Sequence, residues 1–209
     1  MLAIVQARLS SKRLPGKALM MLGAKNILEH TINRIKHSKK ISSVVVATSN
    51  CTTDHPIAQN AKAIGTEVYR GDLNDVSRRL LGAAKTSGAK SFVRISADSP
   101  FLDWRIIDQA IDIHEVGNAD LVTNIFPRTF PKGQSVEIIN TRSLDKICNI
   151  ERSSDQMEHV TPYFYENYIN FKIFSFTSGQ NQSDSIHCID NSIDFEIASI
   201  TALSTAEFA

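Results

Sequence analysis

A short segment near the start of the chain concentrates side chains that suit a polyphosphate. Residues 6–17 read QARLSSKRLPGK and contain four cations and two serines but no acidic residue. Cationic side chains offset several negative charges, and backbone N–H groups in a loop bind phosphate oxygens. The segment follows the first predicted strand directly, and the turn at Pro15-Gly16 would return Lys17 towards the end of that strand. We therefore predict a phosphate-binding loop. It is not a P-loop, because the G-x-x-x-x-G-K-[ST] spacing is absent, and a solvated basic loop is the alternative.

Two aspartates stand where predicted strands end and have the chemistry of a cation site. Asp98 follows the apolar run FVRIS, and Asp190 follows the run HCI. Carboxylate oxygens are preferred ligands of Mg²⁺, which often bridges protein carboxylates and substrate phosphates. Each aspartate has an alternative role as the cap of a turn or helix. A lone aspartate favours capping, whereas a second carboxylate shifts the balance towards a metal site.

Composition and charge limit the class of protein. The chain has 209 residues, 42% of them hydrophobic and 22% charged, with a net charge of +1, which fits one globular domain and gives no general reason to expect a nucleic acid partner. No run approaches the roughly 20 apolar residues of a membrane helix, and three cysteines show no metal-binding spacing, so we expect a cytoplasmic protein without a membrane partner. The charge is segregated: residues 1–40 carry +8 and the rest −7.

Hydrophobic periodicity predicts the elements that position these residues. Short β-branched runs alternate with amphipathic stretches, which is typical of a parallel sheet covered by helices. The strands predicted in the first 125 residues are Leu2–Ala7, Ser43–Ser49, Glu67–Arg70, Phe92–Ser96 and Asp120–Ile125. Beyond residue 126 we predict the strands Ser135–Asn140, Phe171–Phe176 and Ile186–Ile189, with helices from about Thr141, near Gln156–Tyr168 and from about Ser192. We predict a single α/β domain with a mostly parallel mixed sheet flanked by helices.

In open sheets of this kind the ligand crevice lies beyond the carboxyl ends of the strands. Polar residues do follow the predicted strands. They are Arg8 to Lys17, Thr48-Ser49-Asn50, Arg70, Asp98, Asn124 and Asp190.

The phosphate loop carries a resemblance to a known family. Residues 7–17 match the pattern A-R-x-x-S-x-R-L-P-G-K, and the chain thereby resembles the cytidylyltransferases that activate acidic sugars. That group includes the acylneuraminate cytidylyltransferases and the spore-coat polysaccharide biosynthesis type, to which the chain is most similar. Further matches in order are residues 45–49 with Asp54, 69–71, 75–76, 94–103, 130–133, 136–137, 158–163, 189–190 and 194–196.

The resemblance implies a Rossmann-like nucleotidyltransferase fold of the nucleotide-diphospho-sugar transferase type and the Mg²⁺-dependent reaction of CTP with a sugar to give CMP-sugar and pyrophosphate. It further implies a homodimer, with residues 1–125 as the nucleotide-binding half and 126–209 as the sugar-binding and dimerisation half. Arg8, Ser11 and Lys17 would contact the triphosphate, with Arg13 in support. Thr48, Ser49 and Arg70 would border base and ribose, and Asp98 and Asp190 would hold Mg²⁺. The candidates for sugar contacts are Asn124, Arg128, Glu137 and His159.

Attack of a sugar hydroxyl on the α-phosphate requires positioning and charge neutralisation rather than a covalent nucleophile, so Lys17, Arg8, Asp98 and Asp190 are the expected catalytic residues. Asp190 and a metal-bound water are alternatives for taking the hydroxyl proton. The chain departs from the family pattern at Ser135 and Met157, which leaves the sugar open. A third departure, Ile193, lies near Asp190 and bears on the expected metal site. Two other functions remain: a glycosyltransferase, although no Asp-x-Asp follows a middle strand, and a nucleotide-binding module without catalysis.

Overall fold

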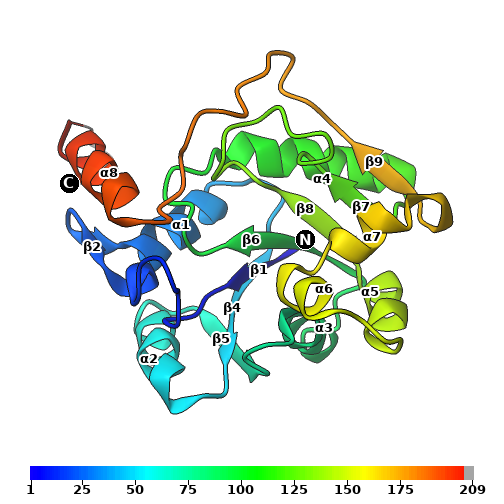
Figure 1. Cartoon of the computed structure of the whole chain (residues 1–209), viewed down its shortest axis with the longest axis horizontal. Helices are drawn as coiled ribbons and strands as arrows, with labels where there is room; N and C mark the ends of the chain where they lie inside the picture. The colour runs from blue at the N-terminus through cyan, green and yellow to red at the C-terminus, as the bar shows by residue number, and fades with distance from the viewer. Residues whose placement is uncertain (205–209) are drawn as a thin grey trace.

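The chain builds a seven-stranded sheet with helices on both faces (Figure 1). The structure is a computed structural model and describes residues 1–204. The strands follow the order β5-β4-β1-β6-β8-β7-β9 across the sheet, and β8 alone among them runs antiparallel to its neighbours. Their bounds are β1 (Leu2–Gln6), β4 (Ser43–Ser49), β5 (Glu67–Gly71), β6 (Ser91–Ser96), β7 (Leu121–Thr123), β8 (Glu137–Asn140) and β9 (Ile173–Ser175). The predicted mostly parallel mixed sheet is therefore confirmed.

Two hydrophobic cores lie on opposite faces of the sheet because successive side chains of a strand point to opposite sides. In β1, Ala3 and Val5 enter one core, and Leu2 and Ile4 enter the other. The first core is covered by α1 (Ile27–Lys36), α2 (His55–Ala63) and α4 (Trp104–Gly117). The second is covered by α3 (Val76–Thr86), α5 (Thr141–Cys148), α6 (Ser154–His159) and α7 (Pro162–Glu166), which lie together in Figure 1.

A third, smaller core joins the two ends of the chain. The hairpin of β2 (Met21–Leu22) and β3 (Lys25–Asn26) packs beside the last helix, α8 (Ser192–Ser204), as Figure 1 shows. Leu22 and Ile27 belong to this core together with Ile189 and Ala198. The segment that carries Asp190 is thereby brought beside the loop that follows β1.

Two predicted elements beyond residue 126 are wrong. Residues 186–189 form no strand, because Ile186 makes only an isolated bridge to Lys132, which itself lies outside the sheet. The helix predicted near Gln156–Tyr168 is broken into α6, α7 and the 3₁₀ helix η3 (Tyr168–Asn170). The break lies at Val160, whose φ of 73° is left-handed, and Pro162 has no N–H to continue the ladder of α6. The predicted starts at Thr141 and Ser192 are confirmed.

Candidate functional site

A cleft of about 510 Å³ opens at the carboxyl ends of β1 and β6. Its walls come from the loop after β1, the segment between β5 and α3 with the start of α3, the end of β6 and the residues after it, the end of α6, and Asp190 two positions before α8. Seven predicted site residues meet there: Arg8, Ser11, Arg13, Lys17, Asp98, His159 and Asp190. The walls hold five Lys and Arg side chains against three carboxylates, a balance that favours an anionic ligand.

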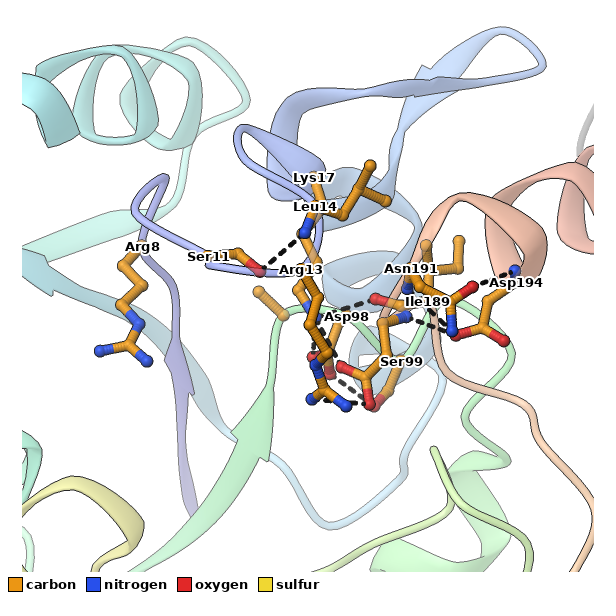
Figure 2. A network of polar contacts seen from close by, with 12 residues as sticks. Arg8, Ser11, Arg13, Leu14, Lys17, Asp98, Ser99, Ile189, Asn191 and Asp194 are labelled. Atoms are coloured by element: carbon orange, nitrogen blue, oxygen red, sulfur yellow. Dashed lines mark hydrogen bonds and ion pairs between the residues drawn. The ribbon is translucent and has the colours of Figure 1, made fainter. Parts of the chain in front are cut away.

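Lys17 is the centre of the polar network in Figure 2. Its ammonium donates to Asp98 Oδ2 at 2.6 Å, to Asp190 Oδ1 at 2.9 Å and to the carbonyl oxygen of Ile189 at 2.9 Å. Arg13 makes an ion pair with the other oxygen of Asp190 at 3.1 Å. Burial acts to lower the pKa of Lys17, but the two carboxylates outweigh it and raise that pKa above its ordinary value.

The fold of the loop after β1 explains how Lys17 reaches these partners. The loop turns back on itself, because Gly16 N–H donates to Leu9 O at 2.9 Å. Gly16 adopts a φ of 77°, a left-handed conformation that glycine tolerates at little cost. Within the loop Ser11 Oγ accepts from Leu14 N–H at 3.3 Å, and at its start Leu9 N–H donates to the buried carboxylate of Asp54 at 2.8 Å. Lys17 then begins the 3₁₀ helix η1 (Lys17–Leu19).

Asp190 is placed by contacts with segments far away in the sequence. Ile189 N–H donates to Asp98 O at 2.9 Å, which puts the two aspartates side by side. Upstream, His187 N–H donates to Lys132 O at 2.6 Å. Gly133 allows this approach: its φ is 95°, and a Cβ there would lie 2.4 Å from the carbonyl carbon of His187. The Phe-Pro-Lys-Gly motif therefore positions the segment that leads to Asp190.

Asp194 stabilises the turn after Asp190. Its Oδ2 accepts from the N–H groups of Asp190 at 2.9 Å and Asn191 at 3.1 Å, and Asn191 Oδ1 accepts from Asp194 N–H at 2.9 Å. Asn191 therefore caps the start of α8, and Asp194 lies in the first turn of that helix.

Arg8 stands apart from the Lys17 network in Figure 2 and points to the opposite wall of the cleft. There it makes an ion pair of 2.5 Å with Glu158 at the end of α6. The hydrogen bond from Arg8 lowers the pKa of the Glu158 carboxyl. Glu158 belongs to the segment 158–163 that matches the family pattern, but the sequence did not predict it as a site residue. Its neighbour His159 is exposed and lies 3.5 Å from Asp155.

Arg79 is a further residue of the cleft that sequence reasoning missed. It is only 2% exposed, and its Nη1 donates to the carbonyl oxygens of Asp72 at 2.5 Å and Leu73 at 3.2 Å. Burial, with the nearby charge of Arg8, lowers its pKa to about 10. Arg79 thus holds the segment between β5 and α3 against the cleft. Nothing in the local pattern distinguishes it from the other arginines of α3.

The predicted base and ribose residues are engaged in contacts within the protein. Thr48 and Ser49 are fully buried in β4, and Ser49 Oγ donates to Asp54 at 2.5 Å. Arg70 donates to the carbonyl oxygens of Ser49 at 2.8 Å and Cys51 at 2.6 Å. Within residues 1–204 none of the three lines the cleft. Their interactions hold the segment after β4, and their contact with a nucleoside stays a prediction.

Three predicted sugar-contact residues are engaged elsewhere in the structure. Asn124 is buried and bridges Gln134 O at 2.7 Å and Val136 N–H at 2.9 Å. Arg128 donates to Ser135 Oγ at 3.1 Å. Glu137 is 2% exposed. None of the three lines the cleft in the described part of the chain, so their contact with a sugar also stays a prediction.

Glu137 belongs to a buried network that reaches the cleft indirectly. It makes an ion pair with Arg94 and accepts from Tyr165 Oη at 2.5 Å. Burial first, and then the Glu137 charge, raises the pKa of Tyr165. Arg94 Nε in turn donates to Gln6 Oε1 at 2.9 Å, and Gln6 lines the cleft. Because Arg94 can only donate, the oxygen of the Gln6 amide must face it.

The donor set around Lys17 fits a hard divalent cation. Two carboxylates and one backbone carbonyl direct oxygen atoms at a single positive charge, and Mg²⁺ prefers oxygen ligands. Among residues 1–204, no group of three or more His, Cys, Asp or Glu side chains forms a metal cluster. Asp98 and Asp190 would therefore hold Mg²⁺ together with oxygens supplied by substrate and water, which is a common arrangement for this ion.

Comparisons with known proteins point to one family. The family model described as cytidylyltransferase matches residues 2–207. An uncharacterised protein of Methanocaldococcus jannaschii is 36% identical over 173 residues, covering 83% of this chain and 70% of its own length. The spore coat polysaccharide biosynthesis protein SpsF of Bacillus subtilis is 32% identical over 167 residues, covering 78% of this chain and 68% of its own.

Solved structures give the same result. A cytidylyltransferase from Leptospira borgpetersenii superposes with a TM-score of 0.92 at 34% identity, over 100% of this chain and 89% of its own. The CMP:2-keto-3-deoxy-manno-octonic acid synthetase complexed with CTP shares the fold, with a TM-score of 0.73 at 16% identity over 98% of this chain and 99% of its own.

None of the helices in the described residues has the length and apolar character needed to span a membrane.

Proposed function

Because the chain belongs to the cytidylyltransferase family, we propose that it transfers CMP from CTP to a sugar and releases pyrophosphate. The observation that carries this proposal is the convergence of the basic loop with Asp98 and Asp190 in one cleft. A polyphosphate needs the cations of that loop, and transfer of a nucleotidyl group needs the carboxylates that hold the accompanying metal.

The chain supplies positioning and charge neutralisation for the transfer. The oxygen of the sugar hydroxyl attacks the α-phosphorus of CTP, and the hydroxyl proton would pass to Asp190 or to water. The bond from that phosphorus to the bridging oxygen breaks, and pyrophosphate leaves with the negative charge. Lys17 and Arg8 would contact the triphosphate from two walls of the cleft and stabilise this charge, with Arg13 in support. Mg²⁺, held by Asp98 and Asp190, would supply further neutralisation and align the phosphates.

The sugar is proposed to be acidic, of the nonulosonate type. Several relatives are named 3-deoxy-manno-octulosonate cytidylyltransferase, such as that of Geobacter sulfurreducens, which is 35% identical over 111 residues. The basic excess of the cleft walls supports an acidic acceptor as well as the triphosphate. The SpsF relative is named for polysaccharide biosynthesis, and we propose that the product serves a surface glycan.

We further propose a homodimer formed through residues 126–209. Most of the exposed large apolar side chains in the described residues lie in this half, and such side chains mark association surfaces when they gather. They are Phe126, Ile150, Tyr168, Ile169, Ile186, Ile193, Ile197 and Ile200. A cytoplasmic location belongs to the same proposal, because CTP is supplied there.

Pyrophosphate release tests the function. The full chain is assayed with each of the four nucleoside triphosphates, with and without Mg²⁺, against a panel of acidic sugars. We expect release with CTP, Mg²⁺ and at least one acidic sugar, and a loss of about a hundredfold in Lys17→Ala. The comparison variant is Lys12→Ala, which removes another cation of the same loop that makes no contact with Asp98 or Asp190 among the described residues, so its rate should fall less than that of Lys17→Ala. Consumption of a nucleotide sugar without turnover of any triphosphate would instead establish a glycosyltransferase.

A further inference from the structure

The Lys17 ammonium occupies a site with the chemistry of a cation-binding cradle. We define the cradle as Asp98 Oδ2, Asp190 Oδ1 and the carbonyl oxygen of Ile189, which lie 2.6, 2.9 and 2.9 Å from Lys17 Nζ. An ammonium has three N–H donors, so each has one oxygen partner. The carbonyl of Ile189 was not predicted from the sequence as part of any site.

The charges of the cradle are already balanced in the free protein. Asp98 and Asp190 carry two negative charges, and Lys17 and Arg13 supply two positive charges within ion-pair distance. A divalent cation entering beside Lys17 would meet a positive charge in contact with its own ligands. Repulsion at such distances is strong where water is partly excluded, and the Lys17 side chain is only 13% exposed.

The cradle is held rigidly, whereas its occupant is flexible. Asp98 and Ile189 are joined through the Ile189 N–H to Asp98 O bond, and the turn at Asp190 is capped by Asp194. The lysine ammonium is instead carried on a four-carbon stem with many rotamers. We expect the backbone that carries the three oxygens to keep its position when the ammonium leaves, and a triphosphate in the cleft offers the ammonium other anionic partners.

We propose that Lys17 is the resident cation of this cradle and excludes divalent metal from the free protein, so that metal and triphosphate enter together. Arrival of the triphosphate moves the ammonium from the cradle oxygens to phosphate oxygens, and the cradle then accepts the metal. The second part rests on the proposed function. The first part, exclusion of metal from the free protein, requires no substrate and is tested without one.

The experiment is a Mn²⁺ titration of the full chain in the absence of nucleotide, with free Mn²⁺ read by electron paramagnetic resonance. Wild type, Lys17→Met and Lys12→Met are compared. We expect Lys17→Met to bind one Mn²⁺ at least about tenfold more tightly than wild type, because the competing cation is gone. Lys12→Met removes the same charge from the same loop and should bind as wild type does.

A double variant locates the bound ion. Lys17→Met with Asp98→Asn should lose the gained affinity, because one of the three cradle oxygens loses its charge. Thermal melts show whether each variant is folded, and Lys17→Gln replaces Lys17→Met if the latter is not. Wild type binding Mn²⁺ as tightly as Lys17→Met, or equal gains in Lys17→Met and Lys12→Met, would overturn the proposal. Failure of the proposed function is a separate result, namely no turnover of any triphosphate by wild type.

Discussion

Two networks of basic and acidic side chains lie close to each other in this protein and differ in their access to solvent. In the cleft network, Lys17 contacts Asp98 and Asp190, whose side chains are 19% and 29% exposed. In the interior network, Arg94 and Tyr165 contact Glu137, whose side chain is 3% exposed. The residue types are alike, but the first network opens to a ligand and the second is closed by protein. We therefore expect changes in the first to affect catalysis and changes in the second to affect stability.

The largest effect is expected in the cleft. Asp98→Asn keeps the shape of the side chain and removes one charge of the cradle, so the rate of pyrophosphate release should fall by about a thousandfold. The melting temperature should stay close to that of wild type. Initial rates and a thermal melt on the same preparation measure both. An active Asp98→Asn enzyme would contradict the role of Asp98.

The corresponding change in the interior should act on stability. Glu137→Gln leaves the Arg94 guanidinium buried without its counter-charge, which should lower the free energy of unfolding by about 3 kcal/mol. For a chain of this size the melting temperature should fall by about 6–12 °C. Asp145→Asn breaks a more exposed ion pair with Lys85 and should cost less than about 1 kcal/mol. Equal losses in the free energy of unfolding of Glu137→Gln and Asp145→Asn would show that the interior network is not shielded from water.

A smaller effect is expected from the hydroxyl that completes the interior network. Tyr165→Phe keeps the ring stacked on Phe126 at 4.6 Å but removes the hydrogen bonds with Glu137 and Thr123. The free energy of unfolding, measured with urea, should fall by about 1.5 kcal/mol. The KM for CTP should not change, because Tyr165 lies behind the cleft wall. A rise in that KM would mean that the interior network positions substrate.

The smallest effect is expected at the ion pair that crosses the cleft between Arg8 and Glu158. Arg8 lowers the pKa of Glu158, so the pair stabilises the folded state above the ordinary glutamate pKa of about 4.3 and loses this effect as the pH falls through the lowered pKa. The side chains are 33% and 44% exposed, so the gain should stay below about 1 kcal/mol.

Urea unfolding of wild type and Glu158→Gln between pH 3 and pH 7 measures this difference. The difference in the free energy of unfolding between the two proteins should be constant above about pH 5 and should shrink to zero below that pH. A difference that grows towards acid pH would contradict the stabilising role of this ion pair.

Much of the structure of residues 1–125 was predictable because its signals are local. The alternation of apolar runs with amphipathic stretches predicted β4 with its observed bounds. The density of cations in residues 8–17 and the position of Asp98 after β6 indicated the cleft. These features depend on residues close together in the chain, which is where periodicity and motif spacing carry information.

The second half was less predictable because its structure depends on distant contacts. The apolar run at 186–189 suggested a strand. The segment is instead held by isolated backbone hydrogen bonds to Lys132 and Asp98 and by the core around Leu22. Glu137 alternates with apolar neighbours as a strand residue should, but the sequence does not show that Arg94 and Tyr165 enclose it. Burial of a side chain is a property of the packed neighbours and not of its own segment.

The sequence by itself predicted the α/β class, and it singled out the basic loop of residues 8–17 and the aspartates Asp98 and Asp190, which line one cleft in the structure. The tertiary structure decided that Asp190 lies beside Asp98 although 92 positions separate them, that Lys17 fills the space between them, and that Glu158 joins Arg8. The physical reason is that local patterns record which face of an element is apolar. Which charged side chains meet depends on how those faces pack. It also depends on the close approach of the backbone at His187 to position 133, which a glycine there permits.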